Sequence, residues 1–273
     1  MQRQMIKKTS SITKQKRAKE ITRKRISKGK NSTGEADVNA KNFIKELKTF
    51  QSTREKEKIQ GYFKSEVGQY GAGDKFIGVR MGQVFSLAKE FMDMDPKEIE
   101  VLLENPIHEV RTGAVSIMDF QARSKKTSAD RRKELFDLYI RRHDRINNWD
   151  LVDRSAPYVV GGFLFDKPRG ILYELAKSKN MWERRTAIVS TFYFIRKGQL
   201  TDTFQIAELL LKDKEDLIHK AAGGWIRAAG GKDPKRLVAF LDKYAVTMPR
   251  TMLRYSIERL TKKQKEYYLK LKI

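Results

Sequence analysis

The stretch Val110-Arg111-Thr112-Gly113-Ala114-Val115-Ser116 decides the fold, because a changed copy recurs at Arg184-Arg185-Thr186-Ala187-Ile188-Val189-Ser190. A fainter third copy is His219-Lys220-Ala221-Ala222-Gly223. The basic anchors Arg111, Arg185 and Lys220 are spaced so that a further copy is expected near residue 148. A period of about 36 residues with two helices each is typical of a helical solenoid, although the usual HEAT repeat is longer, at about 40 to 47 residues.

Helical spacing of apolar residues extends beyond these copies. Val84, Leu87, Ala88 and Phe91 follow the i, i+3, i+4, i+7 pattern of one helix face, and alternating β-branched runs are hard to find. Prolines stand where helices begin, directly after Asp95, Asn105, Lys167, Asp233 and Met248. These patterns predict an all-α chain, a right-handed α-solenoid of HEAT-like repeats in which small residues after each basic anchor let paired helices approach closely.

Composition limits the class of protein further. The chain has 273 residues, of which 40% are hydrophobic, so it can bury a substantial core in one or two domains. It has no cysteine, which excludes disulfides, thiolate metal sites and a cysteine nucleophile. No run approaches the roughly 18 apolar residues of a membrane span. We therefore expect a soluble, intracellular protein without membrane contact.

The positive charge is unevenly placed. Residues 1–33 carry twelve Lys or Arg against Glu20 alone, so this segment accounts for +11 of the net +24 and leaves +13 for the rest. A segment this polar cannot offset its ordering entropy by burial, so we expect disorder in isolation. Either it is a solubilising tail or leader, or it is an arm that contacts phosphates without regard to sequence. Because the rest of the chain keeps about half of the excess charge, we expect loss of this segment to weaken binding to phosphates without abolishing it.

The domain prediction follows from these boundaries. Residues 1–33 form the basic tail, residues 34–69 an N-terminal helical segment, and residues 70–273 the solenoid domain. In a solenoid the second helix of each pair lines the concave side. We therefore expect the fourth copy, Arg185 and the segment from Lys220 to Trp225 to face a common groove that fits an elongated duplex.

The segment Asn147-Asn148-Trp149-Asp150-Leu151-Val152-Asp153 falls at the predicted fourth copy. Trp149 and Asp153 are four residues apart and share one helix face. An aromatic ring beside a carboxylate suits a reaction that develops positive charge on a nucleic acid. Asp150 is the competing carboxylate, and we assign it to the helix start, where the helix dipole favours an anion.

Four motifs follow one another along the chain. They are Trp149-Asp150-Leu151-Val152-Asp153 with Ser155-Ala156-Pro157, Trp182-Glu183-Arg184-Arg185-Thr186-Ala187, Lys220-Ala221-Ala222-Gly223-Gly224-Trp225, and Met248-Pro249-Arg250-Thr251-Met252-Leu253-Arg254-Tyr255. In order and spacing they resemble the AlkD-like DNA alkylation repair glycosylases, which are HEAT-like α-solenoids. The similarity runs from about residue 70 to about residue 260, and residues 1–69 carry little of it.

The resemblance implies excision of purines alkylated at N3 or N7 from double-stranded DNA without base flipping. A family tryptophan and aspartate that flank the sugar of the lesion match Trp149 and Asp153, the predicted catalytic residues. A family arginine that holds the DNA backbone matches Arg185. We place Arg184 and Lys220 beside it as further DNA-binding residues.

The last predicted DNA-binding residue is Trp225. The second active-site tryptophan of the family directly follows Lys-Ala-x-Gly, but Gly224 occupies that position here and Trp225 comes one residue later. One residue is about 100° around a helix. Trp225 therefore either faces away from the groove or is restored to it by a local bulge.

Other candidates carry less information. The three histidines, His108, His143 and His219, lack metal-ligand spacing, so we expect no metal and no cofactor. The aromatic residues Tyr62, Phe63 and Tyr70 either reach a duplex or pack the first helix. A second basic region is either a backbone-binding rim or a solvated face, and it consists of Arg123, Lys125, Lys126, Arg131, Arg132, Lys133, Arg141 and Arg142.

The prediction from sequence is a monomeric, monofunctional alkylpurine DNA glycosylase that leaves an abasic site. Its partner is double-stranded DNA with alkylated bases, so we expect it in the cytoplasm, associated with the nucleoid. The alternative is a non-catalytic HEAT-like nucleic-acid-binding protein with the same charge and no productive site. A third possibility, a protein-interaction scaffold, leaves the net charge of +24 without a partner.

Overall fold

The computed structural model describes residues 38–64 and 69–271, so the predicted basic tail at residues 1–33 lies outside the described residues. The described part of the chain is all-helical, with fourteen α-helices, one short 3-10 helix and no strand beyond a single bridge between Lys75 and Ile107. Residues from Ala40 to Ile273 group into one compact unit. The all-α prediction is confirmed.

The helices are short and follow one another closely. They are α2 (Ala40–Lys48), α3 (Thr53–Phe63), α4 (Met81–Glu90), α5 (Pro96–Leu103), α6 (His108–Arg123), α7 (Ala129–Arg141), η1 (His143–Arg145), α8 (Trp149–Val159), α9 (Gly170–Leu175), α10 (Met181–Arg196), α11 (Thr201–Leu209), α12 (Asp216–Gly230), α13 (Pro234–Tyr244), α14 (Arg250–Ser256) and α15 (Lys262–Lys270).

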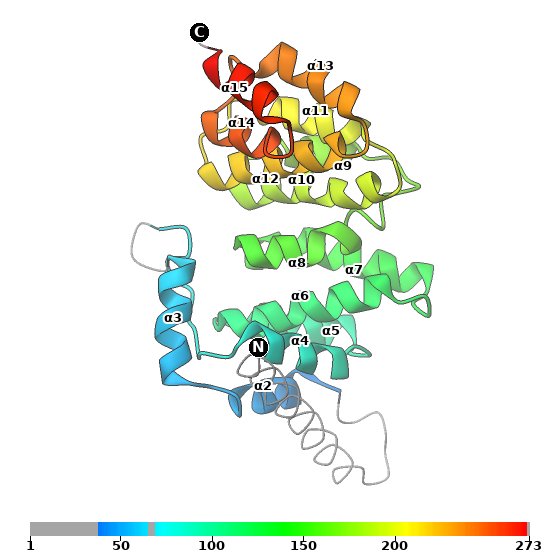
Figure 1. Ribbon diagram of the computed structural model, residues 1–273. Helices are drawn as coiled ribbons and strands as arrows, with labels where there is room; N and C mark the ends of the chain where they lie inside the picture. Colours follow the sequence, from blue (N-terminus) through cyan, green and yellow to red (C-terminus); the bar gives the residue numbers. More distant parts are fainter. Residues whose placement is uncertain (1–37, 65–68, 272–273) are drawn as a thin grey trace, which may run out of the picture. The chain divides into compact units, whose positions relative to one another are not determined.

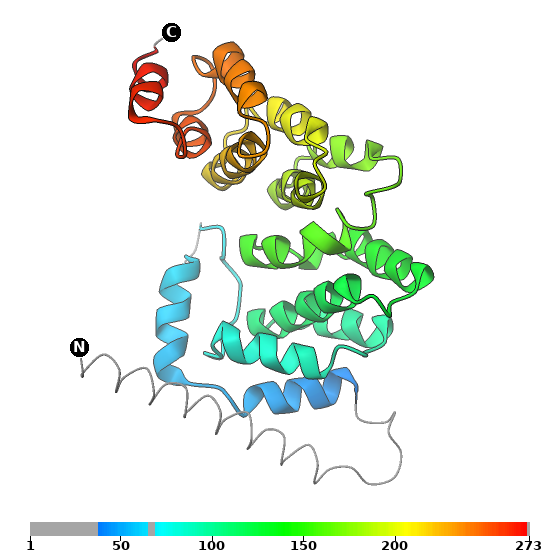
Figure 2. The same cartoon turned by 45° about the vertical axis from the view of Figure 1, so that its right-hand side comes forward.

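Within the unit from Ala40, the helices form two layers (Figures 1 and 2). In one layer α4, α6, α8, α10, α12 and α14 each pack on the next. The helices α5, α7, α9, α11 and α13 pack against this row as a second layer. This arrangement is that of a helical-repeat solenoid, as the repeat spacing predicts.

The repeat anchors lie on corresponding helices of the first layer. Arg111 is on α6, Arg185 on α10 and Lys220 on α12, and the copy expected near residue 148 is α8. The small residues after the anchors allow close approach: a Cβ added at Gly113 would lie 2.3 Å from the Phe43 ring of α2. On α12, a Cβ at Gly223 would lie 2.5 Å from the carbonyl oxygen of Met252 in α14. Small residues thus allow close approach, as predicted, but the helices that approach are α2 and the next helix of the same layer, α14, and not the paired helices of one repeat.

Helix starts follow the predicted proline positions. Asp95 and Asp233 cap α5 and α13 by accepting backbone hydrogen bonds, with proline at the first helical position. An N-cap side chain satisfies a backbone N–H that the helix itself leaves unpaired. The periodic residues Val84, Leu87 and Ala88 are buried on α4. Among the described residues, none of the helices combines the length and the apolar character that crossing a membrane requires.

Helix α3 stands apart from the layers, across the ends of α4, α6 and α8 in both views (Figures 1 and 2). Residues 77–79, in the loop between α3 and α4, are fixed by the buried carboxylate of Glu109. This carboxylate accepts hydrogen bonds from the backbone N–H groups of Ile77, Gly78 and Val79. Gly78 has a φ of +80°, and a Cβ there would lie 2.0 Å from the carbonyl oxygen of Ser52. Glycine at this position therefore lets the start of α3 approach the loop.

Candidate active site

The site is built on the first turns of α8. Asn148 caps this helix, and its side-chain oxygen accepts the backbone N–H of Trp149 at 2.8 Å. The helix then places Trp149 and Asp153 one turn apart on one face, as their spacing predicts. Leu151, on the opposite face of the same helix, is buried, which leaves the face of Trp149 and Asp153 directed away from the core.

Aromatic residues from outside α8 surround Trp149. The ring of Phe63, at the end of α3, stacks on the indole with centroids 5.5 Å apart and planes 18° apart. Tyr62 approaches the same indole edge-on at 5.8 Å. The indole Nε1 donates a hydrogen bond to the hydroxyl of Tyr70 at 3.3 Å. Phe63 is buried, but Tyr62 is 67% exposed, so Tyr62 presents an aromatic surface beside Trp149.

Asp153 is held by Arg185 of α10. The guanidinium donates from Nε to Oδ1 at 2.9 Å and from Nη2 to Oδ2 at 2.8 Å, which makes a bidentate pair. Its Nη1 donates to the carbonyl oxygen of Leu217 at 2.7 Å. Arg185 is buried, whereas the Asp153 side chain is 38% exposed. Arg185 therefore fixes the orientation of a carboxylate that solvent or a ligand can still reach.

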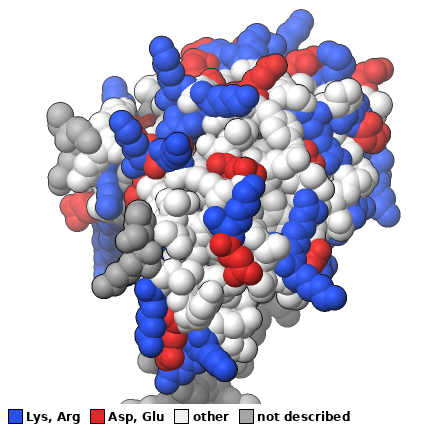
Figure 3. All heavy atoms as spheres, turned by 90° about the horizontal axis from the view of Figure 1, so that it is seen from above, with Lys and Arg blue, Asp and Glu red and all other residues white. Residues whose placement is uncertain are grey.

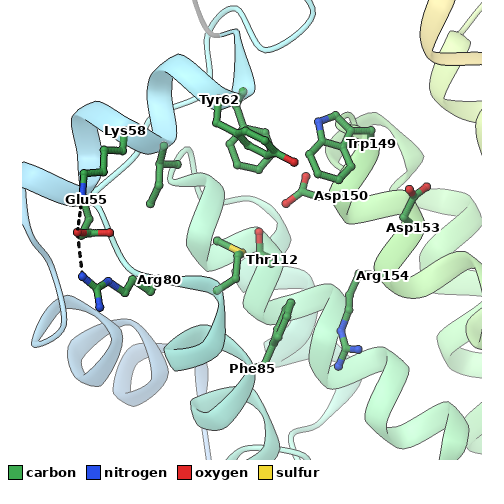
Figure 4. A pocket seen from close by; sticks show the side chains of 13 residues that line it. Glu55, Lys58, Tyr62, Arg80, Phe85, Thr112, Trp149, Asp150, Asp153 and Arg154 are labelled. Carbon is green, nitrogen blue, oxygen red and sulfur yellow. Dashed lines mark hydrogen bonds and ion pairs between the residues drawn. The ribbon is translucent and has the colours of Figure 1, made fainter. Parts of the chain in front are cut away.

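A cavity of about 580 Å³ opens beside these residues, between α3 and the starts of α4, α6 and α8 (Figure 4). Its volume is within the roughly 300–1,000 Å³ range of small-molecule sites. The wall is aromatic and aliphatic for most of its extent, with three carboxylates and three cations. The lining residues are Glu55, Lys58, Ile59, Tyr62, Phe63, Arg80, Met81, Phe85, Thr112, Trp149, Asp150, Asp153 and Arg154.

A buried charged network lies behind the cavity. His108, at the start of α6, donates from Nε2 to Asp150 Oδ2 at 2.8 Å and from Nδ1 to Asp74 Oδ2 at 3.2 Å. Asp74 also binds the guanidinium of Arg111 and accepts the Asn148 side-chain amide at 2.9 Å. The network thus ties both neighbours of Trp149, the cap Asn148 and the first-turn Asp150, to α6 and to the loop before α4.

The two carboxylates keep His108 charged. Burial disfavours the imidazolium, but Asp150 and Asp74 raise the pKa of His108 to about 9. Burial likewise disfavours the Asp74 carboxylate, but His108 and Arg111 lower the pKa of Asp74 to about 2. At neutral pH His108 and Asp74 therefore form a buried ion pair, and His108 has both ring nitrogens occupied. Among the residues that the structure describes, no group of three His, Asp or Glu side chains is arranged to hold a metal ion.

The other predicted DNA-binding residues lie on α10 and α12. Arg184 pairs with Asp213, with Nε 2.5 Å from Oδ2, and donates to backbone carbonyl oxygens of residues 178 and 179. Lys220 pairs with Asp216 one turn earlier at 2.7 Å, and this carboxylate raises the pKa of Lys220. The pair of Lys220 is open to solvent, whereas the carboxylate of Asp213 in the pair of Arg184 is buried.

Trp225 packs on the neighbouring helix. Its ring centroid is 5.3 Å from that of Phe192 on α10, two turns beyond Arg185 on that helix. The whole of α12 is regular α-helix, so the alternative of a restoring bulge does not occur. A Cβ added at Gly224, where the family tryptophan is expected, would meet no atom within 4 Å. There is therefore free space beside position 224, and the indole of Trp225 lies against Phe192 instead of in that space.

Several of these residues are absent from the predicted site. The interpretation of Phe63 as packing of the first helix is right, but neither Tyr62 nor Tyr70 was connected to Trp149. His108 was dismissed because its sequence neighbours offer no metal spacing. A usable signal was present: His108 and Glu109 directly precede, and Arg111 lies within, a repeat copy made otherwise of small and apolar residues and hydroxyl residues, which indicates buried charges with buried partners.

Comparisons with known proteins agree with this architecture. The model of the DNA alkylation repair enzyme family matches residues 43–260. A solved structure of a predicted DNA alkylation repair enzyme from Enterococcus faecalis superposes with a TM-score of 0.60 and 16% identity, over 78% of this chain and 97% of that chain. The crystal structure of smu.31 from Streptococcus mutans UA159 gives a TM-score of 0.46 and 16% identity, over 81% and 99%. None of the curated proteins matches the sequence.

The fold and the site define a helical-repeat protein with an aromatic and acidic cavity beside one helix of its first layer. The likeness to the Enterococcus faecalis structure supports the fold. Because the family model covers most of its length, the chain belongs to the DNA alkylation repair enzyme family. The resemblance inferred from the four motifs is confirmed, and membership supports a role in DNA repair with DNA as the substrate.

Proposed function

We propose that the protein is a monofunctional DNA glycosylase that hydrolyses the N-glycosidic bond of cationic N3- or N7-alkylpurines in duplex DNA. It acts as a monomer, leaves an abasic site and keeps the damaged base in the stack. The observation that carries the proposal is the placement of Trp149 and Asp153 on one cavity, with Asp153 locked in orientation by Arg185. Family membership supplies the DNA substrate.

The reaction starts from a base that already carries positive charge. When the bond between the sugar C1′ and the base nitrogen breaks, its electron pair stays with the base, which leaves neutral. Positive charge then develops on the deoxyribose, as in glycoside hydrolysis. A water oxygen bonds to C1′, and one proton is released. Because the leaving group is activated in advance, no strong general acid is required.

Asp153 and Trp149 act on the charge that develops on the sugar. A fixed carboxylate lowers the energy of the cationic transition state and can accept a hydrogen bond from the attacking water. The bidentate bond from Arg185 uses one lone pair of each Asp153 oxygen and leaves the others available. The face of Trp149 contributes roughly 0.5 to 2 kcal/mol of cation–π attraction.

Lys58 lines the cavity but is unsuited to covalent catalysis. Its side chain is exposed and its Nζ lies 3.3 Å from Glu55. A Schiff-base lysine is activated by desolvation or by a neighbouring cation, and a neighbouring carboxylate acts in the opposite sense. The surroundings of Lys58 therefore support a monofunctional reaction.

Arg184 and Lys220 are proposed to contact the DNA backbone. Trp225 is not part of this proposal, because the regular helix α12 leaves it one position away from the family tryptophan, packed on Phe192. Lys220 can exchange its carboxylate partner for a phosphate, since both members of its ion pair with Asp216 are exposed. Arg184 is held by the buried carboxylate of Asp213, so it would meet a phosphate while it keeps that partner. On the face shown in Figure 3, Lys and Arg are spread widely with Asp and Glu among them. This distribution favours many weak phosphate contacts over one strong basic patch.

The test is release of 7-methylguanine and 3-methyladenine from methylated duplex DNA under single-turnover conditions. We expect the parent protein to release both bases and Asp153→Asn to lower the rate by about 100-fold or more, the effect of removing one preorganised electrostatic group. Asp166→Asn is the matched control, because Asp166 is exposed and pairs with Lys167 outside the cavity. This control should retain the parent rate.

Two outcomes contradict the proposal. If the parent releases no base from DNA that it binds, the protein is the non-catalytic nucleic-acid-binding alternative. If Asp153→Asn and the parent release bases at the same rate, Asp153 has no catalytic role.

A further inference from the structure

A second cavity lies at the opposite end of α8 from Trp149. It has a volume of about 270 Å³, against about 580 Å³ for the cavity beside Trp149. The ends of α6, α8 and α10 form it, together with α7 and the loop after α8. Tyr158 lines it and comes nine residues after Trp149, which is about 14 Å along a helix axis. The two cavities share no lining residue.

The wall of the second cavity combines aromatic rings with cations. Three of its side chains are aromatic and three are basic, and no carboxylate is among the described residues that line it. They are Tyr158, Phe163, Tyr193, Arg123, Lys125 and Arg132. The cavity beside Trp149 has equal numbers of acidic and basic side chains, so the two cavities differ in charge. The second cavity therefore suits a negatively charged ligand.

Close approach of α8 and α10 brings two of these rings together. A Cβ added at Gly161, just after α8, would lie 2.1 Å from the carbonyl oxygen of Ser190 on α10, so glycine permits this spacing. Tyr158 and Tyr193 then meet with ring centroids 5.6 Å apart and planes 85° apart. Both rings, like that of Phe163, are partly exposed. A planar group in the cavity can therefore stack on one ring and contact the edge of another.

Helix ends explain only part of the positive charge. Arg132 donates from Nη2 to the carbonyl oxygen of Ser124 at 2.7 Å, as cations near helix C-termini commonly do. Arg123 donates from Nε to the buried carboxylate of Asp119 at 2.8 Å, but its side chain is still 43% exposed. Lys125 is exposed and forms no ion pair with the residues that the structure describes. Capping thus accounts for Arg132 and leaves Arg123 and Lys125 unexplained.

Asp119 does not neutralise Arg123. Its carboxylate also lies 3.2 Å from Nη1 of Arg154, so one negative charge is shared by two guanidinium groups. Cζ of Arg123 lies 3.8 Å from the centroid of the Tyr158 ring. Proteins bind nucleotides of single strands with this combination, in which bases stack on aromatic side chains and phosphates bind Lys and Arg.

We propose that this second cavity binds one nucleotide unit, with its base against the tyrosine rings and its phosphate on Arg123 and Lys125. The volume lies just below the roughly 300–1,000 Å³ range of small-molecule sites, which limits the ligand to one unit. The unit is either a free nucleotide or an unpaired nucleotide of a DNA strand, because both offer the same chemistry. A base that stays paired and stacked in a duplex does not offer its faces, so the inference goes beyond the proposed glycosylase function.

The experiment measures binding of dTMP to the full chain by isothermal titration calorimetry, with thymidine and inorganic phosphate as partial ligands. The parent should bind dTMP at least about tenfold more tightly than either, because only dTMP uses the rings and the cations together. Lys125→Met should weaken binding of dTMP by about three- to tenfold, the loss of one exposed charge-assisted contact. Lys126→Met is the matched control, since this exposed lysine is the next residue and does not line the cavity. It should keep the parent affinity.

Tyr193→Leu tests the aromatic wall. It should weaken binding of dTMP by about tenfold, the loss of one stacking contact, and leave binding of inorganic phosphate unchanged. Tyr267→Leu is its control, because Tyr267 is exposed on α15 and does not line the cavity. Asp153→Asn should bind dTMP as the parent does, so failure of the glycosylase proposal and failure of this one are distinguishable. Should Tyr193→Leu not fold, the comparison of Lys125→Met with Lys126→Met decides.

The two sources of the nucleotide are separated with a duplex that carries a single-stranded dT overhang and the same duplex with blunt ends. A preference for the overhang that Lys125→Met loses and Lys126→Met keeps identifies a DNA strand. Binding of dTMP that depends on Lys125, without such a preference, identifies a free nucleotide.

The inference is overturned if neither dTMP nor the overhang responds more to Lys125→Met than to Lys126→Met, or if thymidine binds as tightly as dTMP. It is also overturned if an acidic peptide alone shows dependence on Lys125, because the cavity would then dock a protein.

Discussion

The charged side chains next to α8 form buried ion pairs, whereas those on α12 form exposed ones. Behind the start of α8, Asp74 in the loop before α4 and His108 and Arg111 on α6 are nearly inaccessible, and Asp74 binds both of the other two. On α12, Lys220 is 43% exposed and pairs with Asp216 on its own helix. A buried pair cannot separate without leaving an uncompensated charge, but an exposed pair exchanges partners at little cost. The α8 side is therefore suited to fixed chemistry, and the α12 side to contacts that adjust to DNA.

The largest effect that tests this comparison is on stability. Arg111→Met removes one cation from the buried network, and we expect the free energy of unfolding to fall by about 3–5 kcal/mol. Lys220→Met makes the same change at the exposed pair and should cost at most about 1 kcal/mol. Urea unfolding of both variants measures the difference. Equal losses would show that the two sides are not held differently.

A second prediction concerns pH. The pKa of His108 is raised from 6.5 to about 9, so the folded state binds the proton more tightly than the unfolded state. The stabilisation is complete below about pH 6.5 and is lost as the pH rises through about 9. It should amount to a few kcal/mol, on the order of the shift in pKa.

His108→Gln isolates this contribution. The free energy of unfolding of the parent should fall between pH 6.5 and pH 9 more steeply than that of the variant. Lys220→Met should follow the parent over this range, because its substitution leaves His108 and both of its carboxylates in place. Parallel pH profiles of parent and His108→Gln would contradict a charged His108.

The same contrast separates what the sequence predicted from what it did not. Helix order and the shared face of Trp149 and Asp153 follow from spacing within one helix, which is a local property. The network joins Asp74, His108 and Asp150 across 34 and 42 positions, and no periodic rule pairs such residues. Asp150 was therefore assigned to the helix dipole alone.

Arg185 illustrates the same limit. The resemblance placed it on the DNA backbone, and a sequence pattern does not indicate that its guanidinium is bonded to Asp153, 32 positions earlier. Contact with a phosphate stays a prediction for this residue. Likewise, the shift of Trp225 was visible in the sequence, but its contact with Phe192 depends on how α10 and α12 pack.

A third prediction uses two neighbouring glycines of α12. Gly223→Ala would place a Cβ 2.6 Å from Cβ of Tyr255 and against the backbone of α14, so it should cost about 1–3 kcal/mol. Gly224→Ala meets no atom within 4 Å and should stabilise the helix by roughly 0.5–1 kcal/mol. Thermal unfolding of the two variants tests whether the position that holds tryptophan in the family is open here. Destabilisation by Gly224→Ala would show that it is not.

The smallest expected effect is on the salt dependence of DNA binding. If Lys220 exchanges Asp216 for a phosphate, Lys220→Met should reduce the slope of log Kd against log salt concentration by about 1 and weaken binding similarly for damaged and undamaged duplexes. Asp216→Asn frees Lys220 from its partner without removing the cation, so it should tighten binding and keep the slope. Arg111 is buried and cannot bind a phosphate of DNA. Arg111 variants that remain folded should therefore leave the slope unchanged. A change in slope on substitution of Arg111, with none for Lys220, would reverse the roles of the two sides.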